Sequence, residues 1–159
     1  MAGYWLFKSE PEVFSIHDLH NAPKKTTSWE GIRNYQARNF LRDTVRKGDG
    51  VLFYHSNADP MGIAGIAQVT REAYPDHFAF DSSHRYFDPD SSPDNPTWVM
   101  VDIQLKSIFP SIITREMLAA DPVCSNMLVL KRGSRLSIQP VTPAEWLAVQ
   151  QLAEKLTAG

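Results

Sequence analysis

The stretch that decides how this chain is interpreted is WEGIRNYQARN, residues 29–39. It holds two aromatic residues, two arginines, two asparagines and a glutamine, and little that suits a hydrophobic core. Aromatic rings stack on bases, amide side chains match the donors and acceptors of a base edge, and arginine matches phosphate. The composition therefore predicts a polar, aromatic-edged pocket for a heteroaromatic ligand. An N-terminal helix turn with a packed Trp29 explains the same composition, so both interpretations stay open.

Other blocks of the sequence accompany this stretch in a fixed order. They are WLFKSEP at 5–11, KGDGVLFYHSN at 47–57, GIAGI at 62–66, WVMVD at 98–102 and SRLSIQPV at 134–141. Together with residues 29–39, these blocks resemble the EVE domain family over nearly the whole chain. The resemblance implies a PUA-like fold related to YTH domains, which bind modified bases in an aromatic pocket.

Bulk properties limit the class of protein. A chain of 159 residues with 43% hydrophobic residues is long enough for one core, and we expect a single domain over residues 1–159. Its one cysteine, Cys124, excludes an intrachain disulfide, and no segment resembles a secretory signal or a membrane span. We expect a cytoplasmic monomer that does not bind membranes. The net charge of -2 argues against non-specific binding to duplex DNA but allows a pocket with a local basic rim.

Local patterns predict α+β secondary structure. Strands are expected at 4–7, 51–55, 63–69, 99–106, 128–130 and 136–138, and helices at 16–20, 35–43, 115–120 and 143–156. Ser15, Thr114 and Thr142 are suited to cap three of these helices. Residues 21–28 read as a polar loop, and residues 74–96 as a long irregular loop rich in proline and aromatics. This order favours a curved mixed sheet or a small β-barrel flanked by helices.

Candidate ligand-binding residues gather in the blocks that carry the resemblance. They are Lys8, Ser9, Glu10, Trp29, Gly31, Arg33, Asn34, Tyr35, Asn39, Tyr54, His55, Ser56, Asn57, Arg135 and Ser137. Trp29 is the expected stacking residue because its neighbours are polar, whereas Trp5, Trp98 and Trp146 lie in apolar patterns and are assigned to the core. Arg33 and Arg38 are the candidates for phosphate.

Two of these assignments have simpler alternatives. His55 ends a hydrophobic strand, so a hydrogen-bonded structural histidine explains it as well as a pocket residue does. Arg38, Arg42 and Arg46 follow at intervals of four residues, which also describes a solvated helix face.

The resulting hypothesis is a non-enzymatic reader that holds one base of DNA or RNA, modified in the case that the resemblance implies. It needs no cofactor and no metal, because the histidines and aspartates of 77–90 have no recognised ligand spacing. One alternative is a small nucleotide- or RNA-directed hydrolase with Lys8, Glu10, Tyr54 and His55 as acid–base candidates. Another is a protein-interaction module built on the aromatic loop 74–87.

Overall fold

The computed structural model describes residues 3–94, 96–131 and 136–158. Six strands form one sheet, namely β1 (Tyr4–Ser9), β2 (Thr26–Ser28), β3 (Gly50–His55), β4 (Gly62–Pro75), β5 (Val99–Thr114) and β6 (Ile138–Pro140). The order across the sheet is β2-β5-β4-β3-β1-β6, with β1 and β3 parallel and the other pairs antiparallel. Within the described residues the order runs from one edge strand to the other, so the sheet is open and mixed.

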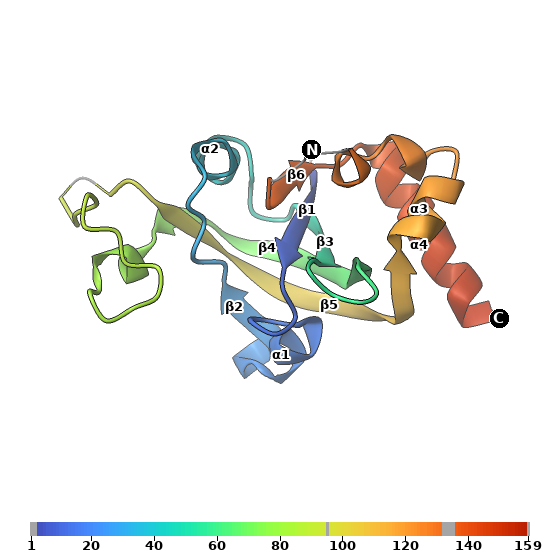
Figure 1. Ribbon diagram of the computed structural model, residues 1–159, viewed down its shortest axis with the longest axis horizontal. Coiled ribbons are helices and arrows are strands. Elements are labelled where there is room, and N and C mark those ends of the chain that lie inside the picture. Colours follow the sequence, from blue (N-terminus) through green and yellow to red (C-terminus); the bar gives the residue numbers. More distant parts are fainter. Residues whose placement is uncertain (1–2, 95, 132–135, 159) are drawn as a thin grey trace.

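Four α-helices pack on the sheet, namely α1 (Ile16–Asn21), α2 (Tyr35–Asp43), α3 (Arg115–Ala120) and α4 (Pro143–Ala158). Short 3-10 turns lie at η1 (Pro23–Lys25), η2 (His77–Phe80), η3 (Cys124–Asn126) and η4 (Leu128–Leu130). Figure 1 shows α3 and α4 gathered at one end of the molecule and the long loop between β4 and β5 at the opposite end. None of the helices in the described part of the chain is long and apolar enough to cross a bilayer.

Strand alternation divides the hydrophobic residues into two clusters. Trp5 and Phe7 of β1 belong to a cluster that includes residues of α1 and α2, whereas Leu6 belongs to one that includes residues of α3 and α4. On β3, Phe53 joins the first cluster and Tyr54 the second. Because successive side chains of a strand point to opposite faces, neighbours in the sequence serve different cores.

The predicted helix starts are confirmed by their caps. Ser15 forms a capping box with Asp18 at the start of α1, and Asn34 accepts the Ala37 N–H at 3.0 Å at the start of α2. The hydroxyl of Thr142 accepts the Glu145 N–H, and the Glu145 carboxylate accepts the Thr142 N–H. These contacts span three residues, so the local sequence is sufficient to place them.

Several elements differ from expectation. The predicted loop at 21–28 contains η1 and β2, and β2 pairs with β5 far along the chain. The predicted strand at 128–130 is the 3-10 turn η4, because a run of three apolar residues has too little periodicity to distinguish the two. The last strand, β6, runs from Ile138 to Pro140 and so shares only Ile138 with the strand predicted at 136–138, and β4 and β5 extend beyond their predicted ends.

Candidate functional site

A cavity of about 690 Å³ opens where the ends of several elements meet. Its walls come from the end of β1 with the turn that follows (8–10 and 13–14), from β2 and its continuation (27–32), from the turn after β3 (56–57), from the long loop (84–86), and from Ser137. The residues that line it therefore lie far apart in the sequence. The volume is in the range of small-molecule sites in proteins.

Trp29 forms part of this cavity and is at the same time a core residue. Its ring contacts Phe7 with centroids 5.5 Å apart, meets Phe53 edge to face at 5.4 Å, and meets Phe14 at 6.4 Å. Only 7% of the residue is exposed. We predicted that Trp29 lines a pocket together with residues 54–57; Ser56 and Asn57 line the same cavity as Trp29, whereas residues 54 and 55 do not. The expectation that Trp29 is partly exposed and contributes little packing is wrong, because three phenylalanines enclose it.

The other tryptophans also separate by environment. Trp5 and Trp98 are buried at 4% and 5%, as predicted for core residues. Trp146, also predicted to be buried, is only partly covered and stacks on Tyr4 at 4.5 Å. Trp29 is thus more enclosed than Trp146, the reverse of what their sequence neighbours suggest.

Gly31 lets the chain pass directly under the long loop. Its φ is +84°, which favours glycine, and a Cβ at this position would lie 2.5 Å from the ring of Tyr86. Its N–H donates to the carboxylate of Asp76 at 3.0 Å. Gly31 therefore brings the backbone of 29–32 against Tyr86, and both line the cavity.

Arg33 anchors the same loop from the other side. Its guanidinium forms an ion pair with Asp76 at 3.0 Å and donates twice to the carbonyl oxygen of Tyr86. It also lies over the rings of Tyr86 and Trp98, 5.6 and 5.4 Å from their centroids. Asp76 is fully buried and accepts the Phe78 N–H as well. We therefore interpret Arg33 as a residue that positions Tyr86, and not as the phosphate contact that the sequence predicted.

The remaining predicted residues of α2 lie outside the cavity. Asn34 caps the helix, and the Asn39 amide oxygen accepts two hydrogen bonds from Arg38. Tyr35 is 61% exposed and packs on Trp98. The structure thus separates the stretch 29–39 into a cavity segment and a helix surface, and the binding role of the helix residues stays a prediction.

Tyr54 and His55 do not line the cavity either. The hydroxyl of Tyr54 lies 3.3 Å from an Arg115 nitrogen on the opposite face of the sheet. His55 is buried, and its Nε2 accepts the Ile16 N–H at 3.1 Å, so it completes the first turn of α1. Burial, followed by the nearby His17, lowers the pKa of His55, which matches a neutral ring that accepts a hydrogen bond. Of the two interpretations of His55, the hydrogen-bonded structural histidine matches this environment.

The end of β1 contributes Lys8, Ser9 and Glu10 to the lining, as placed by the sequence. The Ser9 hydroxyl donates to the Phe14 carbonyl, and the Lys8 N–H donates to the carbonyl oxygen of Ser137. Burial and the charge of Arg115 lower the pKa of the Lys8 ammonium. Arg135, which was also predicted to bind the ligand, lies outside the described residues.

Sequence reasoning missed the contribution of the long loop. His84, Arg85 and Tyr86 line the cavity, and the Nδ1 of His84 accepts the Tyr86 N–H at 3.1 Å. Phe78 and His84 stack at 4.4 Å, which ties η2 to this rim. The length and aromatic content of the loop marked it as functional, but its contact with Gly31 depends on the folded chain.

The cavity combines aromatic walls with hydrogen-bonding groups. Trp29, Phe14 and Tyr86 supply rings, and Ser56, Asn57 and Ser137 supply hydroxyl and amide groups. Such a lining suits a flat ligand with polar edges. In the described part of the chain, no three His, Cys, Asp or Glu residues gather closely enough to hold a metal ion.

The open mixed sheet has the fold of the PUA-like class of domains that the sequence resemblance implies. A YTH domain of Zygosaccharomyces rouxii MRB1 protein, solved with N6-methyladenosine RNA, shares the fold with a TM-score of 0.55 at 12% identity, covering 96% of this chain and 86% of that one. Within the class, the EVE domain family model matches residues 3–152, and the chain belongs to that family.

Relatives in several organisms resemble this chain over nearly all its length. Thymocyte nuclear protein 1 of Homo sapiens is 43% identical over 172 residues, covering 98% of this chain and 76% of the relative. A hypothetical protein from Leishmania major has a TM-score of 0.93 at 39% identity, covering 99% and 98% of the two chains. The human THYN1 protein in complex with 5-methylcytosine containing DNA has a TM-score of 0.88 at 44% identity, covering 96% and 98%.

Proposed function

We propose that this protein is a non-enzymatic reader that holds one modified base of a nucleic acid in the cavity over Trp29. The observation that carries the proposal is an aromatic-polar cavity in a fold whose human relative has been solved with methylated DNA. The base would enter between Trp29 and Tyr86, with Ser56 and Asn57 near its edge. Stacking in such a site contributes roughly 1–3 kcal/mol per base.

Recognition of a modification follows from the aromatic walls of the cavity. Covering a methyl group with aromatic carbon removes apolar surface from water and stabilises the complex by roughly 1 kcal/mol. Trp29 is fixed by three phenylalanine contacts, so it offers a rigid surface that need not be ordered on binding. Extrusion of the base from a duplex consumes part of this energy, which favours single-stranded or easily opened substrates.

The hydrolase alternative has weaker support. Its acid–base candidates do not gather in the cavity, because Tyr54 belongs to the core that includes residues of α3 and α4, and His55 is engaged with the first turn of α1. Of the four candidates, Lys8 and Glu10 line the cavity. For the protein-interaction alternative, Phe78 is stacked on His84 and Tyr86 lines the cavity, so these rings of the long loop are engaged within the fold, whereas Phe87 is exposed.

The test is a binding assay with single-stranded 11-mers of DNA and RNA. Each carries one central 5-methylcytosine, N6-methyladenine or the unmodified base, and fluorescence anisotropy reports affinity. We expect one modified base to bind about fivefold more tightly than its unmodified counterpart, the ratio that 1 kcal/mol provides. Equal affinities for all oligonucleotides would refute modified-base recognition, and turnover of any of them would favour the hydrolase.

Two variants localise the site in the same assay. Tyr86→Ala removes one wall of the cavity and should abolish the preference for the modified base. Leu147→Ala is the control, since Leu147 is 55% exposed on α4, at the other end of the molecule from the long loop (Figure 1). Loss of the preference in both variants, or in neither, would mean that the base binds elsewhere.

A further inference from the structure

Cations and rings lie side by side in a continuous column that leads away from the cavity. Arg33 lies over Tyr86 at the rim and over Trp98 behind it. Trp98 meets Tyr35 at 5.0 Å, and the guanidinium of Arg38 lies 4.9 Å from the centroid of Tyr35. The column therefore joins the cavity rim to the outer surface of α2.

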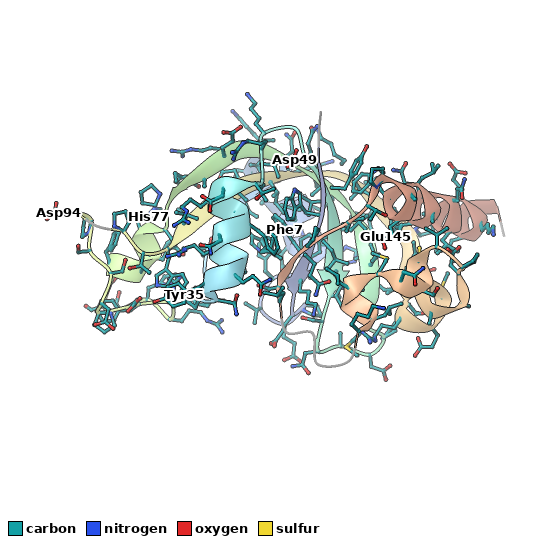
Figure 2. The ribbon with its side chains drawn as sticks, turned by 90° about the horizontal axis from the view of Figure 1, so that it is seen from above. Phe7, Tyr35, Asp49, His77, Asp94 and Glu145 are labelled. Carbon is teal, nitrogen blue, oxygen red and sulfur yellow. The ribbon has the colours of Figure 1, made fainter. Side chains whose placement is uncertain are left out.

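The outer end of this column is open to solvent. Tyr35 has 61% of its surface exposed, and Figure 2 shows it at one end of α2, on the side of the molecule that carries the long loop and His77. Arg38 is held by Asn39 and by the carbonyl oxygen of Thr97. Both of these partners are neutral, so they orient the guanidinium without cancelling its charge.

The positive charge continues along α2 to Arg42 and, past the end of the helix, to Arg46. Arg42 is paired with Asp43 at 2.8 Å, whereas the guanidinium of Arg46 is held by the carbonyl oxygens of Asp43 and Val45. The pKa of Asp43 is lowered by its hydrogen bond to Arg42 and by the charges of Arg38 and Arg46, which places all three arginines in one electrostatic neighbourhood. This face is basic in a chain whose net charge is -2.

We propose that this surface, formed by Tyr35, Arg38, Arg42 and Arg46 and here called the α2 track, binds the single-stranded nucleotides next to the base in the cavity. Arg33 and Trp98 separate Tyr35 from the rim, so Tyr35 contacts a base further along the strand than the immediate neighbours of the bound base, and the arginines contact the phosphates that follow. An exposed aromatic residue beside a row of arginines is the usual combination for sequence-tolerant binding of single strands. The inference rests on the proposed function and adds a second contact region, connected to the cavity through Arg33.

The positive charge of the α2 track and its position beside the cavity favour a nucleic-acid strand as its ligand. Arg38 and Arg42 are four residues apart, so their side chains leave the same face of the helix about one turn apart, and successive phosphates of a strand can reach them in turn. The column ends at Tyr86 on the cavity rim, so a strand whose base enters the cavity leaves it at the start of the track.

The experiment compares a trinucleotide with an 11-mer, both single-stranded DNA with a central 5-methylcytosine, together with the unmodified 11-mer. Only the longer oligonucleotides reach from the cavity to the track. Tyr35→Ala should weaken binding of both 11-mers about tenfold, the size of one lost stacking contact, and leave the trinucleotide unchanged. Tyr35→Phe keeps the ring and should bind all three oligonucleotides like the wild type. Arg38→Gln should reduce the slope of log affinity against log salt for the 11-mers by about 0.7, the share of one phosphate on a single strand.

The outcomes separate the track from the reader function. If the wild type does not distinguish modified from unmodified 11-mers but Tyr35→Ala still weakens both, the reader function fails and the track stands. If Tyr35→Ala binds the 11-mers as tightly as the wild type, or weakens the trinucleotide equally, the track is refuted. If the wild type binds none of the oligonucleotides, both proposals are refuted. Leu147→Ala and thermal melts of each variant control for loss of folding.

Discussion

Replacing Trp29 by alanine tests whether the cavity and the core share one residue. The side chain is 7% exposed and touches Phe7, Phe14 and Phe53, so its loss leaves a hole lined by three rings. Truncation of a buried tryptophan costs about 3–5 kcal/mol. For a domain of this size each kcal/mol lowers the melting temperature by roughly 2–4 °C, so we expect a drop of roughly 10 °C.

Trp146→Ala is the matched comparison. Trp146 is only partly covered and stacks on Tyr4, so its removal should cost about half as much, roughly 1–3 kcal/mol. Thermal and urea unfolding of both variants, followed by circular dichroism, measure the difference. Trp29→Ala should unfold first. If it melts within about 2 °C of the wild type, or later than Trp146→Ala, the packing argument for Trp29 is refuted.

Trp29→Phe separates stability from binding. A phenylalanine retains part of the contact with the surrounding rings but offers a smaller stacking surface to a ligand. We expect most of the stability to return, while affinity for the modified oligonucleotide stays below that of the wild type. Full recovery of affinity would mean that the indole does not contact the base.

Three further predictions concern other parts of the molecule. Asp76→Asn leaves the buried end of Arg33 without its charged partner and should cost about 3 kcal/mol, measured by urea unfolding, with faster proteolysis of the long loop around Tyr86. His55 has a folded pKa below its ordinary value of 6.5, so the unfolded chain binds more protons and stability should fall as the pH drops below about 6.5. His55→Gln should lessen that fall in urea titrations at pH 5 to 8, and an unchanged pH profile would contradict the Nε2 contact with Ile16. For the wild type and a single-stranded 11-mer, engagement of about three phosphates predicts a log–log salt slope near -2, and a slope steeper than about -5 would indicate a broad basic interface.

Local signals in the sequence were sufficient for the parts of the fold that depend on local contacts. The helix at Tyr35–Asp43 was predicted at its exact bounds from the apolar side that Phe40 and Leu41 supply, and in the structure Asn34 caps it from the adjacent position. β2 was missed because its residues, Thr26 to Ser28, have no apolar alternation, and the strand exists only through pairing with β5. The predicted strand at 128–130 failed because a short apolar run suits a 3-10 turn equally well.

The same distinction between local and long-range contacts applies to the candidate site. Ser56 and Asn57 follow a buried strand and were placed correctly in the cavity with Trp29. Tyr54 was misplaced because strand alternation directs it to the other core. Tyr86 could not be found from sequence, since its contact with Gly31 joins positions far apart along the chain through a glycine that has no side chain to signal it.

The sharing of Trp29 between cavity and core constrains how such a site can diversify. A substitution there changes the ligand surface and also the packing of three phenylalanines, so selection on binding cannot act on this residue alone. Position 86 at the rim is less constrained, because Arg33 holds it by the backbone carbonyl of Tyr86, an atom that every residue type possesses. The side chain at this position can therefore be exchanged while the hydrogen bonds to Arg33 persist. New ligand preferences in this fold should therefore arise from substitutions in the long loop, while Trp29 and the phenylalanines packed against it stay unchanged.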